Sequence, residues 1–310
     1  MAETVLPRGR LAPSPTGLLH LGHARTFVLA WLNVRSRGGE LCLRLEDLDT
    51  SRCRPEFAEA TLRDLEWLGL DWDGPVVTQA SRLDELRAAA MRLEAAGLAY
   101  RCFCTRADLL SAPQRGVDEQ RYAGTCRGGR APHLAPGPSA LRLRVPEGAI
   151  PFVDGIAGEQ RYDVAREVGD FMIQNRAGVP SYQLAVVVDD AARGVNEVFR
   201  GDDLLSSTPR QMLLLRALGL PAPRWYHAPL VLDATGRRLA KRADDLSLAT
   251  LRSAGVDPRA IVAWALSSAG FDVGARVTPR EAASTFDLAR LLRAPALLSE
   301  AVLARLLAAR

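Results

Sequence analysis

The sequence predicts an α/β protein built around a parallel sheet, because segments typical of strands and of helices alternate over residues 8–70. The length agrees with this class: 310 residues, 48% of them hydrophobic, can bury a sizeable core and correspond to about two domains. Cysteine, glycine and proline then crowd residues 100–151 and interrupt the alternation. This interruption predicts an insertion in the sheet-forming part of the chain.

The first half of the predicted sheet region has two strands and two helices. In chain order these are a strand at 8–15, a helix at 20–39, a strand at 40–49 and a helix at 54–70. The first strand runs into a loop with two prolines, and Gly38-Gly39 stops the first helix. Pro55 suits the first turn of the second helix, where its missing N–H costs no hydrogen bond.

The second half resumes after the insertion. Strands are predicted at 182–190 ("YQLAVVVDD"), 196–201 ("NEVFRG") and 225–233 ("WYHAPLVLD"), with a helix at 207–219. Beyond about Ser247 the chain is predicted to be mostly helical, for example over 259–271 and 288–309.

Composition narrows the class of protein. A net charge of +4 and a pI near 9.0 are compatible with a polyanionic partner without establishing one. No stretch approaches the ~20 apolar residues of a membrane span, and the N-terminus lacks a signal-peptide core, so we expect a cytoplasmic protein without a membrane partner. The five cysteines are an odd number that argues against a disulfide framework and leaves metal binding or burial.

A phosphate-binding loop is predicted at residues 12–23, "APSPTGLLHLGH". Neither G-x-G-x-x-G nor the P-loop pattern is present, but this Pro/Gly loop opens onto a helix start, where free N–H groups favour anions. His20 and His23 fall on one helix face there, and Gly22 leaves room for a flat group against the backbone. The alternative is that His20 belongs to the helix cap and His23 is a buried, satisfied histidine.

Four ordered motifs resemble class I aminoacyl-tRNA synthetases. "PSPTGLLHLGH" (13–23) looks like their first signature, and "RRLAKR" (237–242) resembles the second. Between them, "LRLEDLDTSR" (43–52) and "VFRGDDLLSSTPRQ" (198–211) are similar to segments of the glutamyl-tRNA synthetase group. The resemblance implies a Rossmann-like catalytic domain that forms an aminoacyl-adenylate from ATP.

The second signature contains Lys241, the only lysine among the 40 Lys and Arg residues. A compact ammonium on a flexible stem can follow a phosphate as its charge moves, whereas a guanidinium prefers a fixed bidentate geometry. By resemblance His20, His23 and Lys241 are catalytic and, with Gly22, bind ATP, which Mg²⁺ accompanies. The alternative for Lys241 is a solvated surface charge.

L-Glutamate is the amino acid that the resemblance implies. Arg10, Tyr182 and Arg200 would hold its side-chain carboxylate, and Ser14 and Glu46 its amino end, together with the backbone of Leu11, Ala12 and Pro13. An arginine fork suits a carboxylate and disfavours neutral glutamine.

A zinc site is predicted in the insertion. Cys102, Cys104, Tyr122 and Cys126 match the C-x-C…Y-x₃-C site of related enzymes, and thiolates suit a four-coordinate structural zinc. His133 is the substitute if Tyr122 is not a ligand, and buried free cysteines are the alternative to a metal. Cys42 and Cys53 are expected in or near the core.

The domain organisation implied by the resemblance is a split one. It comprises residues 1–99 and 182–246 as the two halves of the catalytic domain, 100–181 as a zinc- and acceptor-binding insertion, and 247–310 as a helical C-terminal part. The chain leaves no room for the anticodon-binding domain of a full glutamyl-tRNA synthetase.

This arrangement resembles a shortened, monomeric paralogue that activates glutamate without tRNA and attaches it to queuosine in tRNA(Asp). The alternatives are a glutamyl-tRNA synthetase body with a separate anticodon-binding partner, and a silent binding paralogue. Ala240 replaces the usual serine of the second signature and is the one feature favouring a silent paralogue; Arg238 and Arg242 supply charge nearby.

Overall fold

The central sheet is parallel, as the sequence predicts. The computed structural model describes residues 5–111, 121–131, 134, 137–237, 239 and 247–309. Its sheet contains β1 (Arg8–Leu11), β2 (Glu40–Leu45), β3 (Val77–Thr78), β9 (Glu197–Gly201) and β10 (Arg224–Ala228). β1 pairs with β2, β2 with β3 and β9 with β10, all in parallel. The amide of Asn196, just before β9, donates to the carbonyl of Arg8 at 3.0 Å, so the second half of the sheet continues beside the first.

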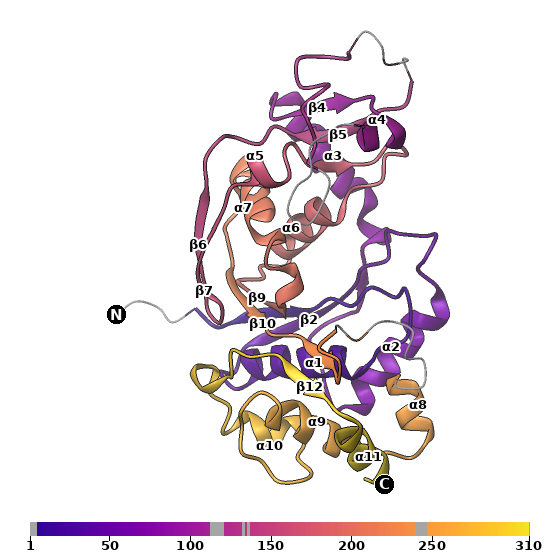
Figure 1. The fold of residues 1–310 in the computed structure, drawn as a ribbon, viewed down its shortest axis with the longest axis vertical. Helices are drawn as coiled ribbons and strands as arrows, with labels where there is room; N and C mark the ends of the chain where they lie inside the picture. The colour runs from indigo at the N-terminus through magenta and orange to yellow at the C-terminus, as the bar shows by residue number, and fades with distance from the viewer. Residues whose placement is uncertain are drawn as a thin grey trace.

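Helices cover both faces of this sheet (Figure 1). On one face lie α1 (Leu21–Arg35), α9 (Pro258–Ser267) and α10 (Pro279–Ala283), and on the other α3 (Leu83–Ala95), α6 (Tyr182–Ala192) and α7 (Ser207–Leu218). Each face has its own buried apolar cluster, one centred on α1 and α9 and the other on α3, α6 and α7. Among the described residues, no helix is long and apolar enough to cross a membrane.

Two helices flank the sheet at one side. α2 (Pro55–Trp67) begins at the predicted proline, and α8 (Leu248–Ser253) packs against it. Asp64 of α2 is fully buried and lies 3.3 Å from the guanidinium of Arg252 in α8. The short 3-10 turns are η1 (Ala80–Arg82), η2 (Asp202–Leu204) and η4 (Leu288–Arg290).

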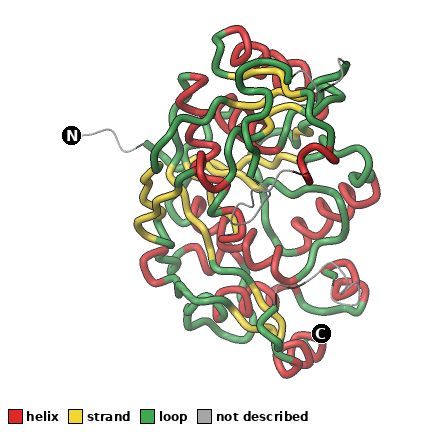
Figure 2. Tube along the Cα trace, turned by 45° about the horizontal axis from the view of Figure 1, so that its top comes forward, coloured by secondary structure: helices red, strands yellow, loops and turns green. Residues whose placement is uncertain are grey.

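The insertion forms its own small sheets, as the tube in Figure 2 shows. β4 (Ala99–Cys102), β5 (Ala140–Leu143) and β8 (Met172–Gln174) are antiparallel, and β6 (Ile150–Asp154) forms a hairpin with β7 (Gly158–Tyr162). The short helices α4 (Arg106–Ser111) and α5 (Val164–Glu167) complete it. At Gly155, in the hairpin turn, a Cβ atom would lie 2.3 Å from the ring of Tyr226, so glycine allows the hairpin to pack on β10.

The strand predicted at residues 182–190 is wrong: this segment forms α6. Its valines favour strands as single residues, but the segment starts after Ser181 in an N-cap conformation and buries Leu184, Ala185 and Val188. The buried Asp189 and Asp190 at its end pair with arginines of neighbouring elements. Tertiary packing on α3 and α7 therefore overrides the local β preference.

The C-terminal segment at 288–309 is also not one helix. Pro295 interrupts it, and β12 (Ala296–Leu298) pairs in parallel with β11 (Val231–Asp233) before α11 (Glu300–Ala308) begins. Similarly, the strand predicted at 225–233 is divided near Pro229 into β10 and β11.

Candidate active site

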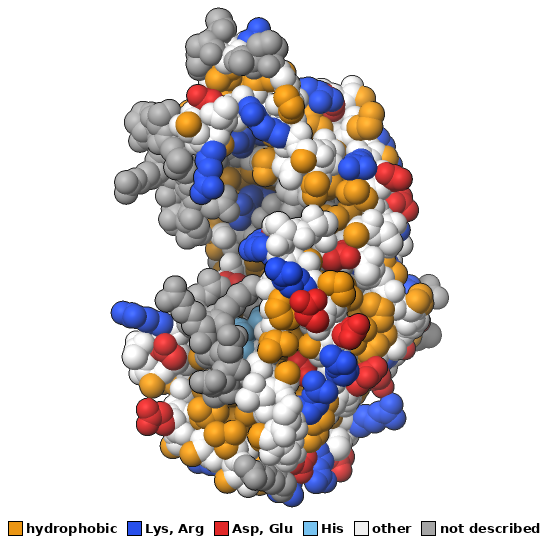
Figure 3. All heavy atoms as spheres, turned by 90° about the vertical axis from the view of Figure 1, so that its right-hand side faces the viewer, with side chains coloured by type: hydrophobic (Ala, Val, Ile, Leu, Met, Phe, Trp, Pro, Cys, Tyr) orange, Lys and Arg blue, Asp and Glu red, His pale blue; other side chains and the backbone are white. Residues whose placement is uncertain are grey.

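A cavity of about 1090 Å³ opens at the carboxyl ends of β1, β2 and β9, beside the start of α1. The predicted residues that line it are Arg10, Ala12, Pro13, Ser14, His20, Gly22, His23, Glu46, Tyr182 and Arg200. Leu11 does not line it, because its side chain is buried in the core. Lys241, together with Arg238, Ala240 and Arg242, lies outside the described residues. Figure 3 shows a hollowed face of the molecule, with histidine and arginine side chains beside the hollow.

The two histidines of the loop occupy the N-terminus of α1. His20 is the N-cap, and its Nδ1 accepts from the amide of Gly22 at 3.1 Å, while its own amide donates to Nδ1 of His23 at 3.2 Å. The rings stack with centroids 3.7 Å apart. Because each Nδ1 is an acceptor, the proton of each neutral ring is on Nε2. The capping interpretation of His20 is therefore confirmed, and both rings also line the cavity.

Gly22 allows this close arrangement. A Cβ atom at this position would lie 2.9 Å from Cε1 of His20 and 3.1 Å from its Nδ1. Any side chain would therefore displace the capping ring.

Arg200, on β9, also lines the cavity, and the protein uses all five of its N–H donors. Nε donates to Nε2 of His227 at 2.9 Å, and the two terminal nitrogens donate to Gln211 at 2.9 Å and Thr208 at 2.8 Å. Two longer contacts complete the set, to the Tyr182 hydroxyl at 3.4 Å and the Leu204 carbonyl at 3.3 Å. Burial lowers the pKa of Arg200, and the interaction with Tyr182 opposes that change.

Arg10 and Glu46 complete the polar lining near the sheet. Arg10 donates to the carbonyl of Phe199 at 2.9 Å and lies 3.5 Å from Asp190. Glu46 accepts from Arg44 at 3.1 Å and from the Ser14 hydroxyl at 3.5 Å. Burial raises the pKa of Glu46, and the charge of Arg44 acts against that shift. Asp190 thus lies against both Arg10 and Arg44, and Glu46 pairs with Arg44.

Sequence reasoning missed the partners of Arg200. Thr208 and Gln211 belong to the "STPRQ" segment, which the sequence marks only as part of a motif and not as a set of partners for Arg200. His227 and Asp154 carry no local signal, since they lie on a predicted strand and in the insertion. Only the pairing of β9 with β10 and the docking of the β6 hairpin bring them together.

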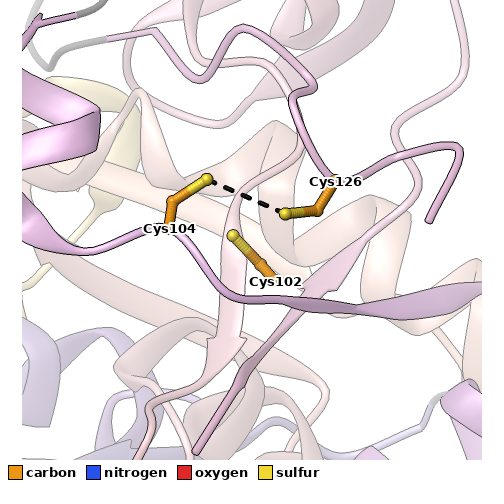
Figure 4. A group of neighbouring side chains, drawn as sticks. All are labelled: Cys102, Cys104 and Cys126. Carbon is orange, nitrogen blue, oxygen red and sulfur yellow. Dashed lines mark hydrogen bonds between the residues drawn. The ribbon is translucent and has the colours of Figure 1, made fainter. Parts of the chain in front are cut away.

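The predicted metal ligands form a separate cluster in the insertion (Figure 4). The sulfur atoms of Cys102, Cys104 and Cys126 lie within 4.8 Å of one another, and those of Cys104 and Cys126 are 3.8 Å apart. The Tyr122 hydroxyl is 3.4 Å from the Cys102 sulfur and 3.7 Å from the Cys104 sulfur. Tetrahedral zinc with bonds of about 2.3 Å requires sulfurs about 3.8 Å apart, so this donor set fits a metal ion.

The other residues considered as metal ligands or core cysteines are His133, Cys42 and Cys53. His133 lies outside the described residues. Cys42 is buried in the core as expected, and half-buried Cys53 lies beside the cavity, its sulfur 3.7 Å from the carbonyl of Glu46.

The chain matches known proteins over nearly its whole length. The family model of the catalytic domain of class I tRNA synthetases (E and Q) matches residues 7–303. A glutamyl-Q tRNA(Asp) synthetase of Symbiobacterium thermophilum is 47% identical over 305 residues, covering 93% of this chain and 94% of the relative. One of Nocardia farcinica is 46% identical over 307 residues, covering 96% and 95%.

A solved structure agrees with the sequence relatives. The glutamate tRNA ligase of Elizabethkingia meningosepticum, determined in complex with its amino acid, superposes with a TM-score of 0.82 at 27% identity, over 96% of this chain and 68% of that one. The chain therefore belongs to the class I glutamyl- and glutaminyl-tRNA synthetase family and, within it, to the glutamyl-Q tRNA(Asp) synthetases.

Proposed function

We propose that this enzyme activates L-glutamate with ATP, without tRNA, and transfers the glutamyl group to queuosine at the wobble position of tRNA(Asp). One observation carries the proposal: a single cavity is lined both by buried arginines and by two stacked histidines at a helix start. The arginines suit the carboxylate of an amino acid, and the histidines at the helix start suit the phosphates of ATP.

In the first step, the α-carboxylate of glutamate attacks the α-phosphorus of ATP and pyrophosphate leaves. The reaction depends mainly on positioning and on stabilising charge at the phosphate oxygens. The Nε2–H groups of His20 and His23 are suited to donate to those oxygens, and Lys241 would add a mobile positive charge. Mg²⁺ would accompany ATP as its counterion.

Glutamate would be held by its two charged ends. Arg10, Tyr182 and Arg200 would bind the side-chain carboxylate, and the two long contacts of Arg200 are the ones a substrate can replace at least cost. Ser14 and Glu46 would bind the amino group, beside the backbone carbonyls of residues 11–13. Glutamine would leave the arginine charge unmatched, which disfavours it.

The second step would transfer the glutamyl group to a hydroxyl of the cyclopentene ring of queuosine, releasing AMP. We further propose that residues 1–99 and 182–246 form the catalytic domain, that 100–181 is the zinc- and acceptor-binding insertion, and that 247–310 is a C-terminal part. β4 begins at Ala99 and α6 at Tyr182, which supports these boundaries.

The metal of the insertion is proposed to be one structural zinc held by Cys102, Cys104, Tyr122 and Cys126. When bound, it would cross-link two chain segments around a small apolar cluster. It lies in the insertion cluster and not among the residues that line the cavity, so it is not assigned a step in the reaction.

Two measurements test this function. Glutamate-dependent pyrophosphate exchange without tRNA is expected, and a chain without exchange would be a silent paralogue. Mass spectrometry of tRNA(Asp) nucleosides after incubation with glutamate and ATP should then show glutamylated queuosine. If glutamate appears instead on the terminal ribose of tRNA(Glu), the chain is a glutamyl-tRNA synthetase body.

A further inference from the structure

His227 lies directly behind Arg200 and has no role in the chemistry described so far. It is on β10 and only 1% exposed. Its Nδ1 lies 2.6 Å from Oδ2 of Asp154, and its Nε2 receives the Nε–H of Arg200 at 2.9 Å. The three side chains thus form a continuous buried chain from the β6 hairpin to the cavity.

The partners define the protonation of this ring. A guanidinium nitrogen can only donate, so Nε2 of His227 must be the acceptor and the ring must be neutral. The remaining proton is on Nδ1 and is donated to the Asp154 carboxylate. Burial and, after it, the charge of Arg200 lower the pKa of His227, although the hydrogen bond to Asp154 raises it.

Asp154 is itself held firmly at the end of β6. Its Oδ1 accepts from the amides of Ile156 at 2.9 Å and Ala157 at 2.8 Å, and from the amide of His227 at 3.2 Å. This leaves Oδ2 for the imidazole. A carboxylate anchored in this way fixes both the tautomer and the orientation of the histidine that it contacts.

We propose that His227 and Asp154 are positioning residues that orient the Arg200 guanidinium toward the side-chain carboxylate of glutamate, an inference that rests on the function proposed above. With Nε held by His227, the guanidinium plane cannot turn. Gln211 and Thr208 then hold one N–H of each terminal nitrogen, and the other N–H of each makes only a long contact. Those two N–H groups are the ones offered to the substrate.

Asp154→Asn is the sharpest test, because the amide can still accept from the turn amides through its oxygen. Its nitrogen would then face His227, force the proton onto Nε2 and place two donors opposite each other at Arg200. We expect the KM for glutamate to rise about tenfold or more, with the KM for ATP unchanged. Discrimination between glutamate and glutamine, as the ratio of kcat/KM values, should fall.

Two substitutions of His227 distinguish its contact with Asp154 from its contact with Arg200. His227→Gln can retain an acceptor near Nε2, whereas His227→Asn can retain the donor to Asp154 but removes the acceptor for Arg200. We therefore expect His227→Gln to preserve more of the glutamate affinity than His227→Asn. A residue with a merely structural role would lose stability in both variants without this order. Asp163→Asn is the matched control, since Asp163 caps α5 in the same insertion without contacting a histidine.

Two readouts do not depend on turnover and separate this inference from the proposed function. Calorimetry measures glutamate binding to each variant directly, and ¹⁵N spectra of labelled histidine report the tautomer of His227. The inference holds if the wild-type ring carries its proton on Nδ1 and Asp154→Asn moves it while weakening glutamate binding. Unchanged glutamate binding in folded Asp154→Asn and His227→Asn proteins overturns it, whereas a wild type that binds glutamate without pyrophosphate exchange contradicts only the proposed function.

Discussion

Arg10 and Arg200, which both line the cavity, differ in how much of their hydrogen-bonding capacity the protein already uses. All five N–H groups of Arg200 have partners. Arg10 donates to Phe199 and lies near Asp190, and within the described part of the chain its Nη2 makes no hydrogen bond. Arg10 therefore offers an open edge, and Arg200 offers charge and two exchangeable contacts. A carboxylate between them would be bound by both.

Arg200→Ala is expected to raise the KM for glutamate at least tenfold, because a charge-assisted contact to the carboxylate is lost. The KM for ATP should remain within about twofold, since the five hydrogen bonds of Arg200 do not involve the two histidines proposed to bind ATP. Steady-state pyrophosphate exchange measures both constants. Arg161→Ala, at an exposed position on β7, is the control and should change neither. If the KM for glutamate were unaltered in Arg200→Ala, Arg200 would not contact the substrate.

Lys241→Ala is expected to reduce pyrophosphate exchange by a factor of about 100–1,000, as found when one preorganised donor to a developing charge is removed. Glutamate binding, measured by calorimetry, should be retained. Lys241→Arg is the informative control because it keeps the charge in a chain that otherwise uses only arginine. We expect it to remain strongly impaired, since a planar fork does not replace a compact ammonium. Wild-type rates of pyrophosphate exchange in either variant would mean that Lys241 is only a solvated surface charge.

At the scale of elements, the start of α1 combines a structural and a functional role. His20 caps the helix through Nδ1, so the neutral ring carries its proton on Nε2, and we propose that this N–H donates to ATP. Asparagine is an excellent N-cap but has no imidazole. His20→Asn should therefore keep the stability within about 0.5 kcal/mol and lose most of the exchange activity, whereas His20→Ala should also lose about 1 kcal/mol. Urea denaturation and pyrophosphate exchange assays on these two variants separate the capping role of His20 from its proposed role in ATP binding. Full activity in His20→Asn would mean that His20 is only a cap.

The packing of α2 on α8 gives a prediction about pH. Burial raises the pKa of Asp64 to about 6, with Arg252 acting against the shift. The folded state therefore holds this proton more tightly than the unfolded state, whose value is about 3.9, and the stability linked to it is lost as pH rises through 6. Asp64→Asn should raise the free energy of unfolding by about 1–3 kcal/mol at pH 7.5 and by much less at pH 4.5.

Denaturation of Asp64→Asn at both pH values checks this. Asp84→Asn, whose side chain is 96% exposed on α3, is the control and should show no such pH dependence. Equal effects of Asp64→Asn at pH 4.5 and 7.5 would show that Asp64 titrates normally in the folded protein.

The elements that the sequence predicted correctly are those whose signal is local. α1 ends at Arg35, shortly before its predicted stop at Gly38-Gly39, α2 starts at its proline, and β1, β2 and β9 lie within the short strands predicted beside turn residues. The failures are those where distant packing decides the conformation. The valine run of α6 is helical because α3 and α7 cover it, and residues 296–298 form a strand because β11 is there to pair with them.

The residues of the candidate site also differ in whether a local sequence signal or the packing of distant elements reveals them. His20, Glu46 and Arg200 could be proposed from the sequence because they lie in motifs that resemble segments of a known family. His227 and Asp154 are 73 residues apart in the chain and meet only because their two strands pack together, so no spacing could have indicated them.

At the scale of the whole molecule, the cavity lies where the two apolar clusters meet. The start of α1 comes from the side packed on α9, whereas Tyr182 and Arg200 come from the side packed on α7, and Arg10 points to that second side, toward Asp190 of α6. The residues of 172–182 that line the cavity belong to the segment leading from the insertion into α6. β8 of that segment pairs with β5, and β5 pairs with β4, which ends at Cys102. Order in the cysteine cluster is thus connected to one wall of the cavity.

Zinc removal tests this connection. We expect metal analysis to find about one zinc per chain and a chelator to lower the Tm, because binding energy at a structural site is folding energy. Cys126→Ser should lose the zinc, whereas Cys53→Ser, outside the cluster, should retain it. Glutamylation of tRNA(Asp) should fall more than pyrophosphate exchange, since the histidines and arginines proposed for catalysis and glutamate binding line the cavity and the cysteines of the cluster do not. If the metal-free protein kept its Tm and its full transfer activity, the three sulfurs would be buried thiols and the fold would need no structural metal.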